Sequence, residues 1–274
     1  MSDVTISPAL RGVVFSGLAL APAGANVVMQ LAQLPVGHGV AESRVESGAL
    51  TQHPIKRTRT TLGYIVAVLL GDDEMREYIR REVNRQHREV HSREGDAVAY
   101  NAFDPELQLW VAACMYRGSL DAVRLVSADV SDDLLDELYG HCARFATTLQ
   151  VPFERWPQDR SAFDEYWNEA LGLVEMDAVT REYLTGIVQL RFLPRALRTW
   201  LGPLHEFVVS GFLAPVFREQ LGLSWSHERQ RRFEGVCRVS ASVYRVLPGA
   251  LREFPLNLVW WDTQRRFRAG RSFV

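Results

Sequence analysis

A histidine on the apolar face of a predicted helix is the side chain in this sequence best placed to bind a metal ion. In the helix predicted over residues 72–91, apolar residues recur at steps of three and four, which places them on one face. They are Met75, Ile79, Val83 and Val90. His87 falls on the same face, where burial favours a neutral imidazole, and neutral imidazole is a good axial ligand for haem iron. A core histidine bonded to a backbone carbonyl has the same spacing, so both interpretations stay open.

A second histidine, His91, follows His87 by one helical turn, and two histidines at i and i+4 can chelate zinc. Glu89 between them stands one place away from the position that the HExxH motif of metalloproteases requires. No histidine has an acidic residue three positions before it, which excludes the Glu-x-x-His pairs of di-iron helical bundles. Because the apolar face turns His87 inward, we expect a metal to bind His87 and not His91.

Three polar side chains share one side of the preceding helix, which is predicted over residues 56–70. Arg57, Thr61 and Tyr64 lie at i, i+4 and i+7, so they project together. A guanidinium, a hydroxyl and a phenol suit an anionic or oxygen-bearing ligand. The alternative is a solvated arginine in the first turn and a tyrosine that belongs to the core.

Helical patterns follow one another along the rest of the chain. Asp104-Pro105-Glu106 combines an N-cap, a proline at the first helical position and an acid in the first turn. Further helices are expected over residues 131–149, 161–176, 177–189, 197–221 and 226–246. The best candidate for a strand, residues 13–20, is ambiguous. We expect one all-α domain over residues 1–274. Its basic, aromatic tail, residues 249–274, is expected to dock back on the domain or form an oligomer contact, and the alternative is a surface for a ligand or a membrane.

Composition and charge exclude several classes of protein. The 31 basic and 33 acidic residues give a formal net charge of -2, so no basic field favours nucleic acid as a partner. The 3 cysteines lie far apart and form no disulfide framework, which favours a reducing compartment and a cytoplasmic location. The sequence contains neither a glycine-rich phosphate loop nor the GxSxG elbow of serine hydrolases.

Residues 12–41 contain no Asp, Glu, Lys or Arg. Such a run fits a signal peptide, a membrane span, or a buried segment packed against an apolar partner. Prolines and polar residues interrupt it, so it holds no stretch of about 18 uninterrupted apolar residues. We favour the buried segment and expect no membrane span.

Five groups of residues, in their order and spacing, resemble a known family. They are residues 26–32 with 36–42, Arg57-x-x-x-Thr61-Leu-Gly-Tyr64, Val83-Asn-Arg-Gln-His87-Arg-Glu-Val90, residues 100–106 with Leu109-Trp110, and residues 204–223. The chain is similar over about residues 12–248 to the haem-b oxygenases that include the bacterial latex-clearing protein (rubber oxygenase) and the fungal MpaB-type oxygenase.

The resemblance implies an all-α fold around a b-type haem. It places His87 at the axial-ligand position on the iron, and Arg57 and Thr61 at positions that line the haem pocket, with Tyr64 on the same side. Glu42 roughly matches a pocket glutamate implicated as a base in rubber-cleaving members.

The sequence also departs from that family. Thr60 stands where rubber-cleaving members carry a lysine, Ser43 replaces a histidine, and Gln33-Leu34 replaces His-Pro. These departures argue against polyisoprene as the substrate. We expect a haem-b-dependent oxygenase that uses dioxygen and a small apolar or alkene-bearing molecule, and we allow for a homo-oligomer. The alternatives are a non-catalytic haem sensor or carrier, and a haem-free helical interaction module.

Overall fold

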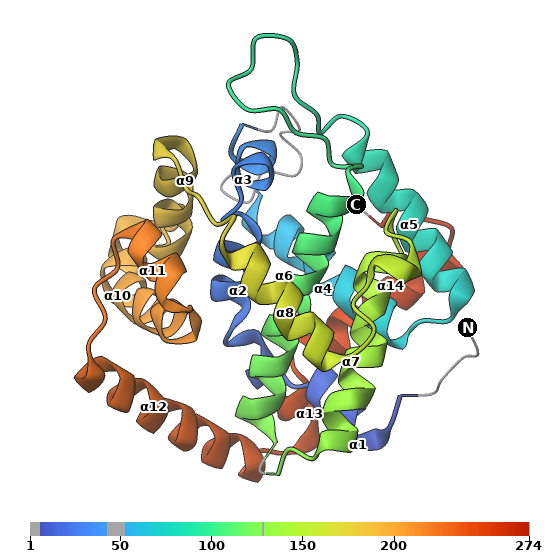
Figure 1. Ribbon diagram of the computed structural model, residues 1–274. Coiled ribbons are helices and arrows are strands. Elements are labelled where there is room, and N and C mark those ends of the chain that lie inside the picture. Colours follow the sequence, from blue (N-terminus) through green and yellow to red (C-terminus); the bar gives the residue numbers. More distant parts are fainter. Residues whose placement is uncertain (1–5, 43–52, 128, 274) are drawn as a thin grey trace.

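Helices make up nearly all of the regular structure. The computed structural model describes residues 6–42, 53–127 and 129–273, and within these ranges it has 14 α-helices and no strand, which confirms an all-α single domain (Figure 1). They are α1 (Pro8–Val14), α2 (Ala23–Gln30), α3 (Leu34–Ala41), α4 (Pro54–Leu70), α5 (Asp73–His87), α6 (Pro105–Val126), α7 (Asp132–Thr147), α8 (Arg160–Leu171), α9 (Ala178–Val188), α10 (Arg195–Phe212), α11 (Pro215–Leu221), α12 (His227–Val246), α13 (Gly249–Glu253) and α14 (Leu256–Arg268), with the 3₁₀ turns η1 (Gly17–Leu20) and η3 (Phe153–Arg155).

Side-chain caps set many of the helix starts. Seven α-helices begin after a serine or aspartate whose side-chain oxygen accepts a hydrogen bond from a backbone N–H in the first turn. The caps are Ser7, Asp72, Asp104, Ser131, Asp159, Asp177 and Ser226. The predicted helix start at Asp104-Pro105 is therefore confirmed, with Asp104 accepting from the N–H of Glu106 at 2.8 Å.

The long helix α6 lies in the core of the domain, with α2 and α7 packed against it. Trp110 of α6 is 1% exposed and stacks on Trp167 of α8, with ring centroids 5.3 Å apart. Its Nε1 donates a 3.0 Å hydrogen bond to the carbonyl of Gln30, which ends α2. In Figure 1, α9, α10 and α11 gather on one side of this core, and α12 runs from them toward α13.

The charge-free segment belongs to this core. It forms the end of α1, then η1, α2 and α3, and Ala25, Val28 and Ala32 have no exposed surface. The interpretation as a buried segment is thereby confirmed, and residues 13–20 hold the end of α1 and the turn η1 instead of a strand. Over the described residues no single helix meets the length and apolar composition of a membrane span, although Pro8–Val14 and Gly17–Gln30, bent by 52° at their junction, meet them as a pair.

Two predicted helix boundaries were wrong. The helix expected over residues 197–221 is broken between α10 and α11, where Ala214 is extended because it precedes Pro215. The helix expected to reach residue 91 ends at His87. Beyond it, Ala102 N–H donates to the carbonyl of Val90 and Ser92 N–H donates to that of Tyr100, so two stretches of backbone pair where a further helical turn was expected.

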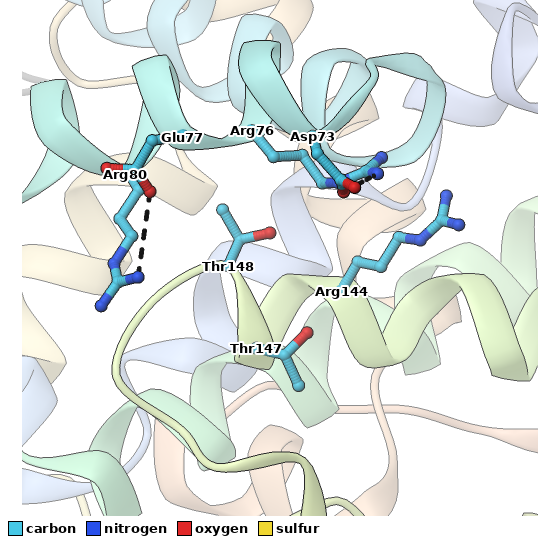
Figure 2. Close-up of a pocket in the computed structure, with 7 residues that line it drawn as sticks. All are labelled: Asp73, Arg76, Glu77, Arg80, Arg144, Thr147 and Thr148. Carbon is cyan, nitrogen blue, oxygen red and sulfur yellow. Dashed lines mark hydrogen bonds and ion pairs between the residues drawn. The ribbon is translucent and has the colours of Figure 1, made fainter. Parts of the chain in front are cut away.

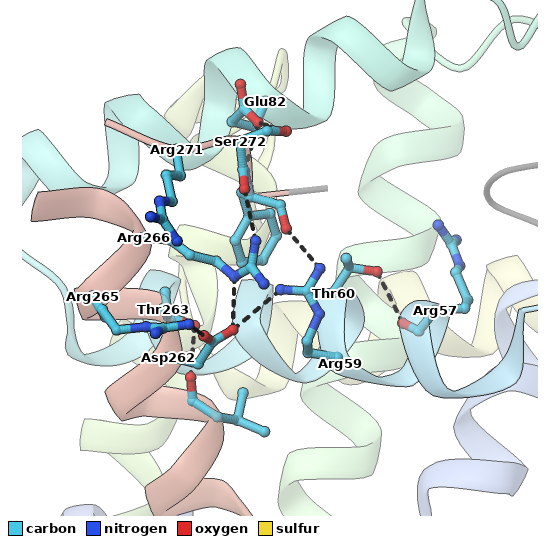
Figure 3. Close-up of polar contacts among 12 residues, drawn as sticks. Arg57, Arg59, Thr60, Glu82, Asp262, Thr263, Arg265, Arg266, Arg271 and Ser272 are labelled. Carbon is cyan, nitrogen blue, oxygen red and sulfur yellow. Dashed lines mark hydrogen bonds and ion pairs between the residues drawn. The ribbon is translucent and has the colours of Figure 1, made fainter. Parts of the chain in front are cut away.

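The basic tail docks back on the domain, as expected. In α14, the carboxylate of Asp262 accepts hydrogen bonds from Arg265 and Arg266 of the same helix and from Arg59 of α4 (Figure 3). Glu82 of α5 accepts a 2.7 Å hydrogen bond from the N–H of Phe273. These contacts fasten the C-terminal segment to the outer sides of α4 and α5.

Candidate functional site

Two of the predicted site residues meet at one end of a helix pair. Gly71 and Asp72 join α4 to α5, and helices joined by so short a loop run antiparallel. Arg57, near the start of α4, and His87, the last residue of α5, therefore lie at the same end. The charge of Arg57 contributes to a lower pKa at His87.

His87 has the properties of a neutral ligand. Burial, and secondly the charge of Arg57, lower its pKa to about 4. Its Nδ1 atom is buried and has no hydrogen-bond partner among the described residues. The nearest ring partner is Phe103, edge-on with centroids 6.2 Å apart. The alternative suggested by the sequence, a core histidine bonded to a backbone carbonyl, is therefore not observed at Nδ1. Because its pKa is low, the imidazole stays uncharged near pH 7 and can bind a metal ion.

His91 lies in a different environment. It is exposed, and its Nδ1 is 3.1 Å from the carbonyl oxygen of Ser92. Because α5 ends at His87, the two histidines do not share the helical face that the i, i+4 spacing predicted. The described residues contain no group of three or more His, Cys, Asp and Glu side chains that could hold a metal ion.

Arg57 lies near the start of α4, and its side chain is exposed. The surrounding protein nevertheless lowers the pKa of its guanidinium by removing part of the water around it. Figure 3 shows Arg57 directed away from the arginines that meet Asp262. Among the described residues, the group whose charge acts on the pKa of Arg57 is the phenol of Tyr183.

Tyr183 of α9 is a residue that the sequence analysis missed. Its hydroxyl oxygen is buried without a hydrogen-bond partner among the described residues. Burial raises the pKa of this phenol and Arg57 partly offsets the rise, so the hydroxyl stays protonated. Nothing in the local sequence of α9 sets Tyr183 apart, because the effect of Arg57 on its pKa arises only in the folded chain.

Tyr64 and Thr61, the other two side chains of the predicted polar face, have different surroundings. The Tyr64 hydroxyl donates a 2.8 Å hydrogen bond to the carbonyl of Phe145, which ties α4 to α7. Thr61 keeps accessible surface one turn after Arg57. Thr60, for which the sequence resemblance suggested a lysine position of the rubber-cleaving enzymes, is buried and donates a 3.0 Å hydrogen bond to the carbonyl of Arg57.

Glu42 belongs to an ionic cluster at the end of α3, in which His38 is buried and the two carboxylates are partly exposed. Its Oε2 lies 2.8 Å from Nδ1 of His38, whose Nε2 lies 2.7 Å from Oδ2 of Asp177. Burial opposes charge on His38, but the two carboxylates outweigh it and raise the pKa of the imidazole. The sequence analysis named Glu42 without its partners, because Asp177 lies far along the chain. Ser43 lies outside the described residues.

Two surface hollows lie elsewhere. One, of about 240 Å³, lies between α5 and α7 and is lined by charged and hydroxyl side chains (Figure 2). They are Asp73, Arg76, Glu77, Arg80, Arg144, Thr147 and Thr148. The other, of about 380 Å³, is lined mainly by apolar residues of α12 and by the segment around Leu251 and Phe254. Neither includes His87, Arg57 or Tyr183.

Comparison with known proteins gives a consistent result. Residues 13–242 match the family described as ER-bound oxygenase mpaB/B'/Rubber oxygenase, catalytic domain. The uncharacterized proteins Rv2237 of Mycobacterium tuberculosis and Mb2261 of Mycobacterium bovis are each 46% identical to this chain over 250 residues, which cover 91% of this chain and 98% of the relative. No solved structure matches it.

Proposed function

This chain belongs to the mpaB and rubber oxygenase family, whose catalytic domain spans residues 13–242, and from that premise we propose that it is a haem-b-dependent oxygenase of a small apolar or alkene-bearing molecule. Membership of an oxygenase family implies an organic substrate and dioxygen. The haem and the chemical class of the substrate are the parts that we propose.

The observation that carries the proposal is the state of His87. A buried imidazole nitrogen without a hydrogen-bond partner is rare in folded proteins, and it points to an unmet ligand. The low pKa of His87 keeps the lone pair free near pH 7, which iron coordination requires. A metal needs three or more side chains when the protein alone holds it, whereas haem iron needs only one axial histidine.

The neighbouring side chains fit a haem. Arg57 offers a cation to an anionic edge, and Phe103 offers an aromatic edge beside His87. The sequence has no CxxCH attachment motif, so binding would be non-covalent. When bound, haem supplies the redox chemistry that activates dioxygen.

The protein's own residues would hold and orient the reactants. His87 would hold the iron, and Arg57 would hold an anionic group. Thr61, one turn after Arg57, would supply a hydroxyl. Glu42 would be held in place by a 2.8 Å hydrogen bond that it accepts from His38. Because this hydrogen bond occupies one carboxylate oxygen, protonation of Glu42 there would compete with it.

The test uses full-length protein reconstituted with haemin. We expect one haem b per chain in a pyridine haemochromogen assay, a defined Soret band, and dioxygen consumption with an alkene-bearing substrate. Stoichiometric haem without substrate-dependent dioxygen consumption across a panel of apolar alkenes would favour a sensor or carrier. A colourless protein that takes up no haem would overturn the haem assignment.

A further inference from the structure

The first half of α10 exposes large apolar side chains along one face. Leu197, Trp200, Leu201 and Leu204 stand at i, i+3, i+4 and i+7, so they lie side by side on the helix, and we call them the apolar row. They are between 43% and 83% exposed, and Trp200 is the most exposed of them. Single apolar side chains on a surface need no explanation, whereas a contiguous row on one helical face marks an interaction surface.

The opposite face of α10 holds the helix to the domain. Gly202 is buried and Val209 is 1% exposed, and the helical period places both on the side away from the apolar row. Nδ1 of His205 lies 2.8 Å from the carbonyl oxygen of Val188 in α9. Because α10 also packs against α2, it is anchored on that side while the apolar row faces outward.

Positive charge accompanies the apolar row. Residues 183–205 contain Arg191, Arg195 and Arg198 and no Asp or Glu. Arg191 is paired with Glu182 of α9, whereas Arg195 and Arg198 form no ion pair with any residue that the structure describes. Both lie in the first turn of α10, on the side away from the apolar row. The exposed half of α10 is therefore apolar on one face and basic on the other.

We propose that this half of α10 docks on the surface of an anionic lipid bilayer, with the apolar row among the upper acyl chains and Arg195 and Arg198 near the lipid phosphates. Helices that carry arginine on one face and Leu and Trp on the other lie along a bilayer surface in this way. A tryptophan ring favours the depth of the lipid headgroups. A second copy of this chain fits less well, because a two-fold contact between α10 helices brings like charges together.

The inference stands apart from the haem assignment, because none of these residues belongs to the predicted haem site. It extends the proposed function in one respect. A small apolar substrate accumulates in a bilayer, so a protein docked there meets it at a higher concentration than in water.

Sedimentation of the full-length protein with vesicles tests the proposal. Vesicles of phosphatidylcholine mixed with phosphatidylglycerol are compared with vesicles of phosphatidylcholine alone. We expect the wild type to bind the mixed vesicles, and to bind them less at high salt. Trp200→Ser should weaken this binding about tenfold, because it removes the largest apolar side chain of the row. Trp261→Ser is the matched control, since Trp261 is 59% exposed in α14, and it should bind like the wild type.

The charge and the depth of insertion have separate readouts. Arg195→Gln combined with Arg198→Gln should weaken binding to the mixed vesicles about tenfold and leave binding to phosphatidylcholine unchanged. The matched control combines Arg231→Gln with Arg238→Gln, two exposed arginines of α12, and should change binding by less than about twofold. At saturating lipid, brominated acyl chains should quench the tryptophan fluorescence of the wild type more than that of Trp200→Ser.

Three outcomes would overturn the inference. The first is a wild type that does not bind the mixed vesicles. The second is an equal loss of binding in Trp200→Ser and Trp261→Ser, which would show that α10 is not the docking element. The third is a dimer, detected by light scattering, that Trp200→Ser dissociates without any change in vesicle binding, which would make the apolar row an interface between two copies of this chain.

Discussion

Nε2 of His38 lies 2.7 Å from Oδ2 of Asp177, a hydrogen bond that ties α3 to the N-cap of α9. The other nitrogen of the ring contacts Glu42 at 2.8 Å, so one buried imidazole joins two carboxylates. Asp177 also accepts from the N–H of Thr180 at 2.9 Å and starts the helix that carries Tyr183. Through His38, Glu42 is therefore linked to the helix that carries Tyr183.

We expect His38 to contribute stability that declines with rising pH. Its folded pKa is raised above 6.5, so its contribution is complete below that value and is lost as pH rises through the folded pKa. His38→Gln should lower the free energy of unfolding by about 1–3 kcal/mol near pH 6, because it removes a buried donor to two carboxylates. Urea unfolding of both proteins at about pH 6 and about pH 9 measures the difference, which should shrink at the higher pH. A difference that does not change with pH would contradict the charged state of His38.

Acid should weaken the contact between His38 and Asp177 by protonating Asp177. Burial alone would raise the pKa of Asp177, but hydrogen bonds from Thr180 and His38 outweigh burial and lower it. Its contribution is present above the unfolded value of 3.8 and is lost as pH falls through the lower folded pKa. Asp177→Asn should therefore lose its effect on the free energy of unfolding below about pH 3. An undiminished effect in acid would mean that Asp177 acts only as a helix cap.

His87 and His91 should differ sharply as haem ligands. We expect His87→Ala to lose haem or its axial ligation, because His87, unlike His91, has a buried nitrogen without a hydrogen-bond partner among the described residues. His91→Ala should keep both, since His91 is exposed after the end of α5. Visible spectra of the two reconstituted variants, with elemental analysis for iron and zinc, make the comparison. Normal haem ligation in His87→Ala, or haem loss confined to His91→Ala, would show the assignment to be wrong.

Arg57 should matter for ligand retention and not for folding. Arg57→Ala should weaken haem affinity by about ten- to a hundredfold, which is the range for a charge-assisted hydrogen bond in a partly buried site. Arg265→Ala is the matched control, because Arg265 is an exposed arginine bound to Asp262 at 3.1 Å. Haem titrations and thermal melts of the apoproteins give the two readouts. We expect no loss of apoprotein stability in Arg57→Ala, since the variant removes an uncompensated charge, and a large loss would instead indicate a structural role.

Tyr64 should behave as a structural residue. Tyr64→Phe removes the hydrogen bond to the Phe145 carbonyl and should cost about 0.5–1.5 kcal/mol of unfolding free energy. Its hydroxyl is already used, so we expect haem affinity to stay within a factor of about two. Chemical denaturation and haem titration of the same variant test both parts. A selective loss of haem at unchanged stability would return Tyr64 to the cofactor site that the sequence suggested.

The sequence alone determined the features that depend on neighbouring residues. Asp104-Pro105 predicts the start of α6, because a cap and a proline act within one turn. The spacing around Ile79 and His87 predicts an inward-facing histidine, because helical periodicity sets the face. The absence of charge over residues 12–41 predicts their burial, because removing apolar surface from water is favourable.

Only the tertiary structure decided the contacts that join distant segments. Arg57 acts on the pKa of Tyr183, and Asp177 meets His38, because packing brings α9 against elements from the first quarter of the chain. The end of α5 at His87 was also decided this way, since backbone pairing between residues 90–92 and 100–102 competes with a further helical turn. Such contacts depend on the arrangement of whole helices, and no local sequence pattern encodes them. The sequence therefore indicated single residues of the site, and the tertiary structure identified the residues that they contact.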